Sequence, residues 1–412
     1  MGGKIKKISA REILDSRGNP TVETTVFLDN DTQGTASVPS GASTGAHEAH
    51  ERRDGGTRYG GRGVMGAISS IMGECEKRLI GMSVTETEKI DAALIALDGT
   101  KNKSNIGANA ILSISLAASR AAAAYEGIEL YEYLSGGKSA KKLPTPMLNI
   151  LNGGAHASNN VEIQEFMIVP LGIEKFPDMM RAAAEIYAAL GKILAKNGYS
   201  RTVGDEGGYA PSLKSDELAI ELIIEAIEAA GYTTDKIKLA LDVASSEWAK
   251  ADKYIMTKSG REYFPDELIA YYTALIESYP IISIEDGLGE DDFSSWERLT
   301  CRLGEKIMLV GDDLFVTNEE RLEKGIEKKT ANAILIKPNQ IGTLTETLNV
   351  IKRSKEAGYS HIISHRSGET TDTFISDLAV ATCAPFIKAG APARGERVAK
   401  YNRLLEIYEK IK

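Results

Sequence analysis

The sequence is poor in cysteine, in aromatic residues and in long apolar runs. Its 412 residues include three cysteines, two tryptophans and five histidines. Cys75, Cys301 and Cys383 lie far apart without a CxxC or Cys/His spacing, which argues against a disulfide framework and indicates a reducing compartment. No segment approaches the roughly 20 apolar residues of a membrane span, and the first residues, MGGKIKKISAREI, lack the apolar stretch of a signal peptide. We therefore expect a soluble, cytoplasmic protein with no membrane partner.

An excess of positive charge is also missing. The formal net charge is -9 and the acidic residues are spread along the chain, so no basic stripe could follow a phosphate backbone. Nucleic acid is therefore not expected as a partner. A length of 412 residues suits two domains, or one small domain and a barrel of about 250 residues.

The first third of the chain has strand patterns followed by helix patterns. Residues 21–28 alternate as in a half-buried strand, and residues 108–124 are rich in Ala, Leu and Ile at helical spacing, with Gly127 just beyond. Residues 1–135 are thus predicted to form an α+β domain. Glycines and prolines make 136–146 the best linker, and a second domain is expected over 147–412.

The second domain contains short apolar runs that each end beside a polar residue. The runs 238–241, 281–284, 307–310, 333–336, 361–364 and 385–387 lead to Asp242, Glu285, Asp312, Lys337, His365 and Lys388. From Glu285 on, these polar residues follow at intervals of 23 to 28 residues, the length of a strand, a helix and two loops. This period favours a (β/α)8-type barrel, in which all strand ends share one rim, with an open doubly wound sheet as the alternative.

Acids and lysines at these strand ends are candidates for a metal site. Asp242, Glu285 and Asp312 are hard oxygen ligands without nearby Cys or His spacing, which suits Mg²⁺ better than zinc, although any one could be a helix cap. Lys337 and Lys388 could balance these acids. Alternatively, a neighbouring cation and burial could lower a lysine pKa until the free amine acts as a base.

Two further acids lie in unusual sequence contexts. Glu206 lies between glycines in GDEGG. It could be part of an ordinary acidic turn, or it could be a general acid if its pKa is raised. Glu165 lies inside the apolar run EIQEFMI, where a carboxylate needs a partner, and it is a second acid candidate or an orienter of the first.

Several loops could bind an anionic substrate. His365, Arg366 and Ser367 combine a guanidinium fork with a hydroxyl just after a strand, which suits a phosphate or carboxylate, with a surface loop as the alternative. His156 could bind substrate or be structural. The segment SGASTG at 40–45 is either a flexible turn or a mobile lid whose hydroxyls reach a metal.

Together these segments resemble the enolase family, from near residue 8 to about residue 405. The matching stretches are AREILDSRGNP at 10–20, SGASTG at 40–45, NGGAHA at 152–157, QEFM at 164–167, GDEGG at 204–208, LDVASSEW at 241–248, IEDGL at 284–288, VGDDL at 310–314, IKPNQIGT at 336–343, SHRSGET at 364–370 and IKAGAPARGER at 387–397. A lysine base paired with Mg²⁺ is the established pattern of enolase-superfamily sites.

The resemblance implies a reaction and a role for each matching residue. It implies a Mg²⁺-dependent, reversible dehydration of 2-phosphoglycerate to phosphoenolpyruvate by a homodimer or homo-octamer. The resemblance also implies that the chain folds as a small α+β domain on a barrel whose early units are irregular. Lys337 would be the base and Glu206 the acid, supported by Glu165. The first Mg²⁺ would be held by Asp242, Glu285 and Asp312, and Ser43 would close on a second, substrate-bridged Mg²⁺. The residues that would bind substrate are His156, Gln164, His365, Arg366, Ser367 and Lys388.

Three alternatives stay open. A racemase or cycloisomerase of the same superfamily would share the metal ligands and a lysine, but is not expected to carry GDEGG, SHRSGET and SGASTG together. A Schiff-base aldolase would use a strand-end lysine without needing three acids around it. A non-catalytic binding protein could keep the fold.

Overall fold

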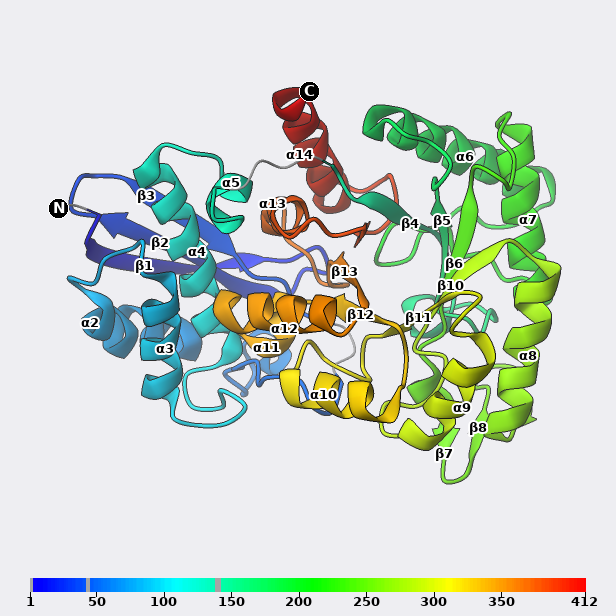
Figure 1. The fold of residues 1–412 in the computed structure, drawn as a ribbon, viewed down its shortest axis with the longest axis horizontal. Coiled ribbons are helices and arrows are strands. Elements are labelled where there is room, and N and C mark those ends of the chain that lie inside the picture. The colour runs from blue at the N-terminus through cyan, green and yellow to red at the C-terminus, as the bar shows by residue number, and fades with distance from the viewer. Residues whose placement is uncertain (1–2, 42–44, 138–141) are drawn as a thin grey trace.

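The first part of the chain folds as an antiparallel sheet covered by helices (Figure 1). The computed structural model describes residues 3–41, 45–137 and 142–412. The sheet has the order β1 (Ile5–Leu14), β2 (Pro20–Leu28), β3 (Gln33–Ser37). The helices that follow are α1 (Met65–Ser70), α2 (Glu76–Leu79), α3 (Thr87–Asp98), α4 (Ala108–Glu126) and α5 (Leu130–Leu134). The predicted strand and the strands-then-helices order are confirmed.

Helix α4 packs closely on the sheet because its residues are small. Thr24 of β2 and Ser113 of α4 share a hydrogen bond of 2.6 Å between their hydroxyls. A Cβ on Gly34 of β3 would lie 2.2 Å from the backbone nitrogen of Ala121, so only glycine fits there. The helix ends at Gly127, whose φ of 69° is the left-handed conformation typical of a C-terminal cap. The predicted helix over 108–124 is therefore confirmed.

The second part forms a closed barrel ringed by helices, on the right of Figure 1. Within the described residues its strand order is β10-β11-β12-β13-β14-β4-β5-β6. The strands are β4 (Thr145–Asn152), β5 (Glu165–Val169), β6 (Lys238–Asp242), β10 (Ile281–Glu285), β11 (Met308–Gly311), β12 (Ala333–Ile336), β13 (Ser360–Ser364) and β14 (Phe386–Lys388). The open-sheet alternative is thus wrong. Strand β5 is antiparallel to both β4 and β6, which confirms the irregular early units.

Helices surround the barrel and a small sheet lies beside it. The helices are α6 (Phe176–Lys196), α7 (Asp216–Ala229), α8 (Pro265–Ser278), α9 (Phe293–Leu303), α10 (Glu319–Lys328), α11 (Pro338–Ile341), α12 (Leu344–Glu356), α13 (Phe374–Ala381) and α14 (Gly395–Ile411). The small sheet has the order β7 (Ala249–Lys250), β8 (Lys253–Ile255), β9 (Glu262–Tyr263). Among the described residues, no helix combines the length and apolar character needed to cross a membrane.

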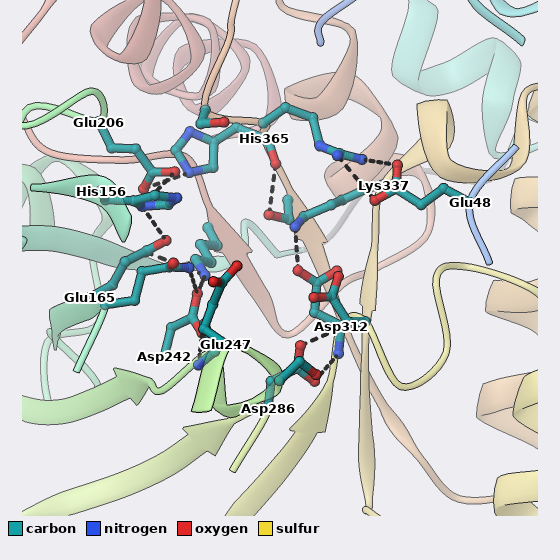
Figure 2. A pocket seen from close by; sticks show the side chains of 18 residues that line it. Glu48, His156, Glu165, Glu206, Asp242, Glu247, Asp286, Asp312, Lys337 and His365 are labelled. Carbon is teal, nitrogen blue, oxygen red and sulfur yellow. Dashed lines mark hydrogen bonds and ion pairs between the residues drawn. The ribbon is translucent and has the colours of Figure 1, made fainter. Parts of the chain in front are cut away.

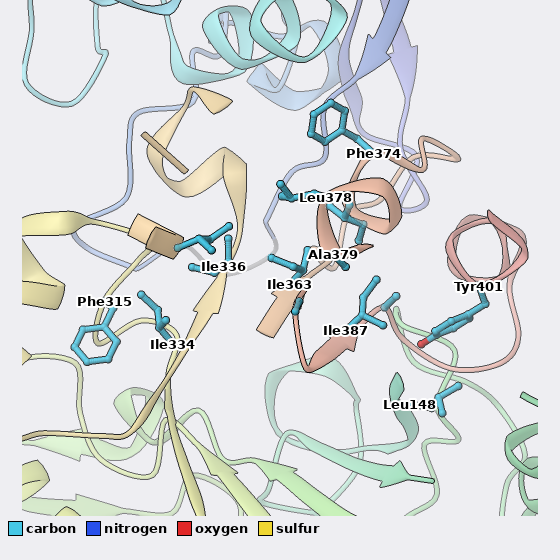
Figure 3. Packing of buried hydrophobic residues seen from close by; sticks show 14 of the residues in the cluster. Leu148, Phe315, Ile334, Ile336, Ile363, Phe374, Leu378, Ala379, Ile387 and Tyr401 are labelled. Atoms are coloured by element: carbon cyan, nitrogen blue, oxygen red, sulfur yellow. The ribbon is translucent and has the colours of Figure 1, made fainter. Parts of the chain in front are cut away.

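Alternate residues of a barrel strand serve two cores. In β12, Ile334 and Ile336 pack in the core beneath the helices (Figure 3). Ala333 and Leu335 belong to the separate cluster that fills the barrel interior. Because side chains alternate between the two faces of a strand, residue 337 continues the interior series at the rim. The same period that builds the core therefore directs the Lys337 side chain into the mouth of the barrel.

Candidate active site

The predicted site residues converge on a pocket at the carboxyl ends of the barrel strands. Those that line it are His156, Gln164, Glu165, Glu206, Asp242, Asp312, Lys337, His365, Arg366, Ser367 and Lys388. Glu285 lies beside the pocket, where it accepts a hydrogen bond from Lys388. Ser43 lies outside the residues that the structure describes. Figure 2 shows Glu206, His156 and Glu165 on one side of the pocket, and Lys337, Asp312 and Glu48 on the other.

Lys388 lies at the centre of a group of buried acids. Its Nζ is 3.0 Å from Asp242 Oδ2, 2.8 Å from Glu285 Oε1 and 3.3 Å from Glu165 Oε2. Burial alone would lower the pKa of Lys388, but Asp242, Glu165 and Glu285 outweigh it and raise that pKa well above its usual value. Lys388 is therefore a fixed ammonium that brings the ends of three strands together.

Lys337 is ion-paired with one of the predicted metal ligands. Its Nζ donates to Asp312 Oδ2, and both side chains are mostly buried. Burial acts to lower the pKa of Lys337, and the cations Arg366 and Lys388 act in the same direction. The contact with Asp312 is closer and outweighs them, so the pKa of Lys337 is raised. The lowered pKa that is expected of a base is therefore absent while Lys337 is ion-paired with Asp312.

The His156 imidazole lies between Glu165 and Glu206, and its Nδ1 has no hydrogen-bond partner among the described residues. His156 Nδ1 is 3.5 Å from Glu165 Oε1 and 3.8 Å from Glu206 Oε1. Burial, followed by the repulsion of Glu206, raises the pKa of Glu165 well above its usual range. Burial also acts to raise the pKa of Glu206, but contacts with His365, His156 and Arg397 outweigh it and hold that pKa well below the ordinary range.

The two acids therefore titrate as a pair that can hold one proton between them. A raised pKa, the condition under which the sequence suggested Glu206 as a general acid, is not found on Glu206 itself. The reason is that Glu206 is surrounded by hydrogen-bond donors, including Asn149 Nδ2 at 3.1 Å from Glu206 Oε2, whereas Glu165 faces other carboxylates.

Arg366, predicted to bind an anion, already binds a carboxylate. Its Nη1 and Nη2 donate to Glu48 Oε2 and Oε1 at 2.8 and 3.1 Å. Gln164 donates from Nε2 to Asp242 Oδ2 at 3.4 Å. Ser367 lines the pocket beside Arg366. The donors of Arg366 and Gln164 thus already face carboxylates within the pocket.

Comparison with known proteins identifies the family. The family description "Enolase, N-terminal domain" matches residues 5–134, and "Enolase, C-terminal TIM barrel domain" matches residues 140–412. The chain belongs to the enolase family. It is 54% identical over 410 residues to the enolase of Rubrobacter xylanophilus and 55% identical over 408 residues to that of Natranaerobius thermophilus. Each match covers 99% of this chain and 95% of the relative.

As an enolase the chain is a carbon-oxygen hydro-lyase, a phosphopyruvate hydratase of glycolysis that acts on a small-molecule substrate. The match over both domains makes the racemase, aldolase and non-catalytic alternatives unnecessary. The family also depends on a metal, so the donor set of the pocket decides which residues could hold one.

The donors of this enolase fit a hard divalent cation. Glu285 Oε2 is buried and, among the described residues, has no hydrogen-bond partner, so its lone pairs are unused. Burial, followed by repulsion from Asp242, raises the pKa of Glu285 well above its usual value, and the contact with Lys388 offsets this only in part. Asp242 and Glu285 lie in register on neighbouring parallel strands. Carboxylate oxygens so placed suit Mg²⁺.

The predicted metal ligands Asp242, Glu285 and Asp312 are not the residues whose possible ligand atoms cluster most closely. Within the described chain, the acid and histidine groups with ligand atoms within 4.8 Å of one another are His156, Glu165 and Glu206, and Asp286, Asp312 and Asp313. Asp286 accepts from the backbone N–H groups of Asp312 and Asp313 at 2.9 and 2.8 Å. It therefore holds the loop that carries Asp312.

Sequence reasoning missed several residues that contact the predicted set. They are Glu48 on Arg366, Asn149 on Glu206, Asp286 under Asp312, Gln340 on Asp312 and Arg397 on His365. Asp286 follows Glu285 directly, and Gln340 belongs to the stretch IKPNQIGT, so adjacency to a predicted residue was an available signal. Arg397 lies in a helix more than thirty residues beyond His365, and no local pattern connects the two.

Proposed function

We propose that the pocket dehydrates 2-phosphoglycerate reversibly to phosphoenolpyruvate, with Lys337 as the base and Glu206 as the acid. The observation that carries this assignment is their placement: Figure 2 shows Lys337 and Glu206 on opposite sides of one pocket. A base and an acid on opposite faces of a substrate can remove a proton from one carbon and assist a leaving group on the next. Glu206 is buried and the Lys337 side chain is mostly buried, which limits the access of bulk water to the reacting atoms.

The proposed reaction moves one proton from C2 to Lys337 and a second proton to the departing hydroxide. In a first step the C2–H bond breaks, its proton passes to Lys337 Nζ, and its electron pair stays on C2, delocalised into the substrate carboxylate. In a second step this pair forms the C2–C3 double bond as the C3–O bond breaks. The departing hydroxide takes the proton held by the Glu165–Glu206 pair and leaves as water. Glu165 holds this proton before the reaction, because burial and the repulsion of Glu206 raise its pKa, and Glu206 would deliver the proton to the hydroxide.

Asp242, Glu285 and Asp312 would hold the first Mg²⁺, with a second arriving with substrate at Ser43. When bound, Mg²⁺ supplies positive charge that stabilises the negative charge developing on the substrate carboxylate. Because Asp312 raises the pKa of Lys337, sharing the charge of Asp312 with a dication would favour the free amine of the base.

The remaining predicted residues bind and orient the substrate. Arg366 and Ser367 would receive the phosphate, because a guanidinium fork matches its oxygens. Lys388 and Gln164 lie beside the predicted metal ligands and would orient the substrate carboxylate. His156 and His365 flank Glu206 and would contact the leaving hydroxyl.

We also propose a homodimer or homo-octamer in the cytoplasm, with the chain divided at the linker 136–146 between residues 1–135 and 147–412. The two separate family matches support this division. The free state of Cys75, Cys301 and Cys383 supports a reducing compartment.

The test is formation of phosphoenolpyruvate from 2-phosphoglycerate by chelator-treated protein, before and after Mg²⁺ is added. We expect turnover with Mg²⁺ only, and a Glu285→Gln variant that needs much more Mg²⁺ for half-maximal turnover. Turnover at the same rate without any divalent ion would contradict the metal assignment, and no turnover with Mg²⁺ would contradict the reaction.

A further inference from the structure

Arg397 lies fully buried beneath the acid side of the pocket. It is the third residue of α14, and its side chain has no exposed surface. Gly390 makes room for it: a Cβ on this glycine, whose φ is +84°, would lie 2.8 Å from Arg397 Cδ and 2.9 Å from the Glu206 carbonyl oxygen. The arginine stem therefore passes directly under the loop of the proposed acid.

The Arg397 guanidinium joins two loops that are far apart in sequence. Nη2 donates to the carbonyl oxygens of Asp205 at 3.1 Å and Ser367 at 2.6 Å. Nη1 donates to the carbonyl oxygen of Arg366 at 2.5 Å. One side chain thus ties the loop that carries Glu206 to the loop that carries His365.

Arg397 also contacts the His365 ring, and this contact determines where the ring hydrogen lies. Nη1 is 2.6 Å from His365 Nδ1. A guanidinium has only donors and keeps its charge, so Nδ1 must be the acceptor. A neutral imidazole that accepts at Nδ1 carries its hydrogen on Nε2. His365 Nε2 lies 3.3 Å from Glu206 Oε2, so the Nε2–H group faces this carboxylate without yet meeting hydrogen-bond geometry.

We infer that Arg397 is a positioning residue that fixes His365 as the Nε2–H tautomer and thereby orients the carboxylate of Glu206. This inference rests on the proposed role of Glu206 as the acid. Without Arg397 the ring could carry its hydrogen on either nitrogen, and the Nδ1–H form would turn a lone pair towards the carboxylate. Two acceptors would then face each other, and Glu206 would lose its alignment with the leaving group.

The charges around His365 support a ring that stays neutral. The charged groups that face it are Glu206 from the 204–208 loop, Lys388 from β14 and Arg397 from α14. Burial lowers the pKa of His365 to about 3; Glu206 opposes this, and Arg397 and Lys388 reinforce it. A protonated ring would place an Nδ1–H against the Nη1–H of Arg397 at 2.6 Å, which the geometry forbids.

The direct test is ¹⁵N NMR of full-length protein labelled at histidine, which reports the tautomer of each ring. The chain has five histidines, so the His365 signals are assigned by their loss in a His365→Gln variant. We expect wild-type His365 to show a protonated Nε2 and an unprotonated Nδ1 at neutral pH. An Nδ1–H tautomer or an imidazolium would overturn the inference, and this result needs no arginine variant to fold.

Kinetics then separate a positioning role from a merely structural one. In Arg397→Met, which keeps the stem and removes the donors, we expect kcat for dehydration to fall roughly 10–100-fold, with KM and C2 proton exchange changing far less. His365 should show mixed tautomers in this variant, and Arg397→Lys should recover part of the loss because one donor returns. Unchanged tautomer and unchanged kcat in Arg397→Met would overturn the inference.

Arg403 provides the matched control, since it lies on the same helix and pairs with Asp377 and Glu129 away from the pocket. Arg403→Met should lower stability and leave the His365 tautomer unchanged. If Glu206→Gln fails to slow dehydration while wild-type His365 is the Nε2–H tautomer, the proposed acid is wrong and the tautomer assignment stands, so the two failures are distinguishable.

Discussion

Glu48 holds both outer nitrogens of Arg366, at 2.8 and 3.1 Å, deep in the wall between the two parts of the chain. Glu48 lies shortly after the 40–45 segment, and its Oε1 also accepts from the backbone N–H of Gly45 at 3.0 Å. Glu48 thus fixes the orientation of the guanidinium fork at the pocket. If Arg366 binds phosphate as proposed, the phosphate would share the guanidinium with Glu48 or displace that carboxylate.

Removal of Glu48 should therefore cost stability that an added anion can restore. In Glu48→Ala the buried guanidinium loses its paired carboxylate, and we expect the free energy of unfolding to fall by about 3–5 kcal/mol. Inorganic phosphate should then stabilise the variant more than it stabilises the wild type, because an anion can bind the released fork. Thermal unfolding with increasing phosphate measures both effects.

The matched control for Glu48 is an exposed pair of the same kind. Arg298 and Asp266 are 2.8 Å apart with largely exposed side chains, so Asp266→Asn should change stability by no more than about 1 kcal/mol. Equal stabilisation of wild type and Glu48→Ala by phosphate would show that Glu48 does not occupy the anion position of Arg366.

Loss of Lys337 should stop the first half of the reaction. Lys337→Ala removes the group assigned to the C2 proton, so exchange of that proton with solvent should fall to background while Mg²⁺ binding survives. Exchange is measured by deuterium incorporation into 2-phosphoglycerate. Lys103 is the control, because it is also buried and paired with a carboxylate, Glu346, but lies outside the pocket. Lys103→Met should retain exchange, and exchange retained in Lys337→Ala would remove it from the role of base.

Asp216 should give the stability a pH dependence of a predictable sign. Its Oδ1 accepts from the backbone N–H groups of Glu162 and Ile163, just before Gln164 and Glu165, and burial raises its pKa to about 6. The folded state then holds the proton more tightly than the unfolded chain, so the free energy of unfolding falls as pH rises from about 4 to 6 and levels off above.

The Asp216→Asn variant keeps an oxygen acceptor but cannot titrate. Its unfolding free energy should lack about 2–3 kcal/mol of the decline that the wild type shows over this window. Urea denaturation at several pH values between 4 and 7 measures the difference. The same decline in both proteins would mean that Asp216 does not bind its proton preferentially in the folded state.

Much of the barrel could be predicted because its strands are buried on both faces. Runs such as 333–336 are continuously apolar, since one set of residues packs under helices and the other inside the barrel. Strand β1 could not be predicted in this way. Only Ile5 and Ile8 are fully buried in it and its other residues are partly or wholly exposed, so the two-residue period is weak.

The sequence predicted most of the residues that line the pocket, but not their protonation. Because the carboxyl ends of barrel strands share one rim, Asp242, Asp312 and Lys337 could be predicted to lie close together. A pKa depends on which neighbour is nearest in space: Asp312 reverses the expected shift of Lys337, and His365 and Arg397 help to reverse that of Glu206. Those neighbours come from other strands or from α14, so no local pattern reports them.

The Glu206→Gln variant tests most directly whether a base and a separate acid act from opposite sides of the pocket. With saturating Mg²⁺ and 2-phosphoglycerate, deuterium incorporation at C2 and formation of phosphoenolpyruvate are measured in the same sample. We predict that dehydration falls roughly 100-fold or more while C2 exchange continues, because the base remains and only the acid is lost. An equal loss of exchange and dehydration would contradict the assignment of separate base and acid.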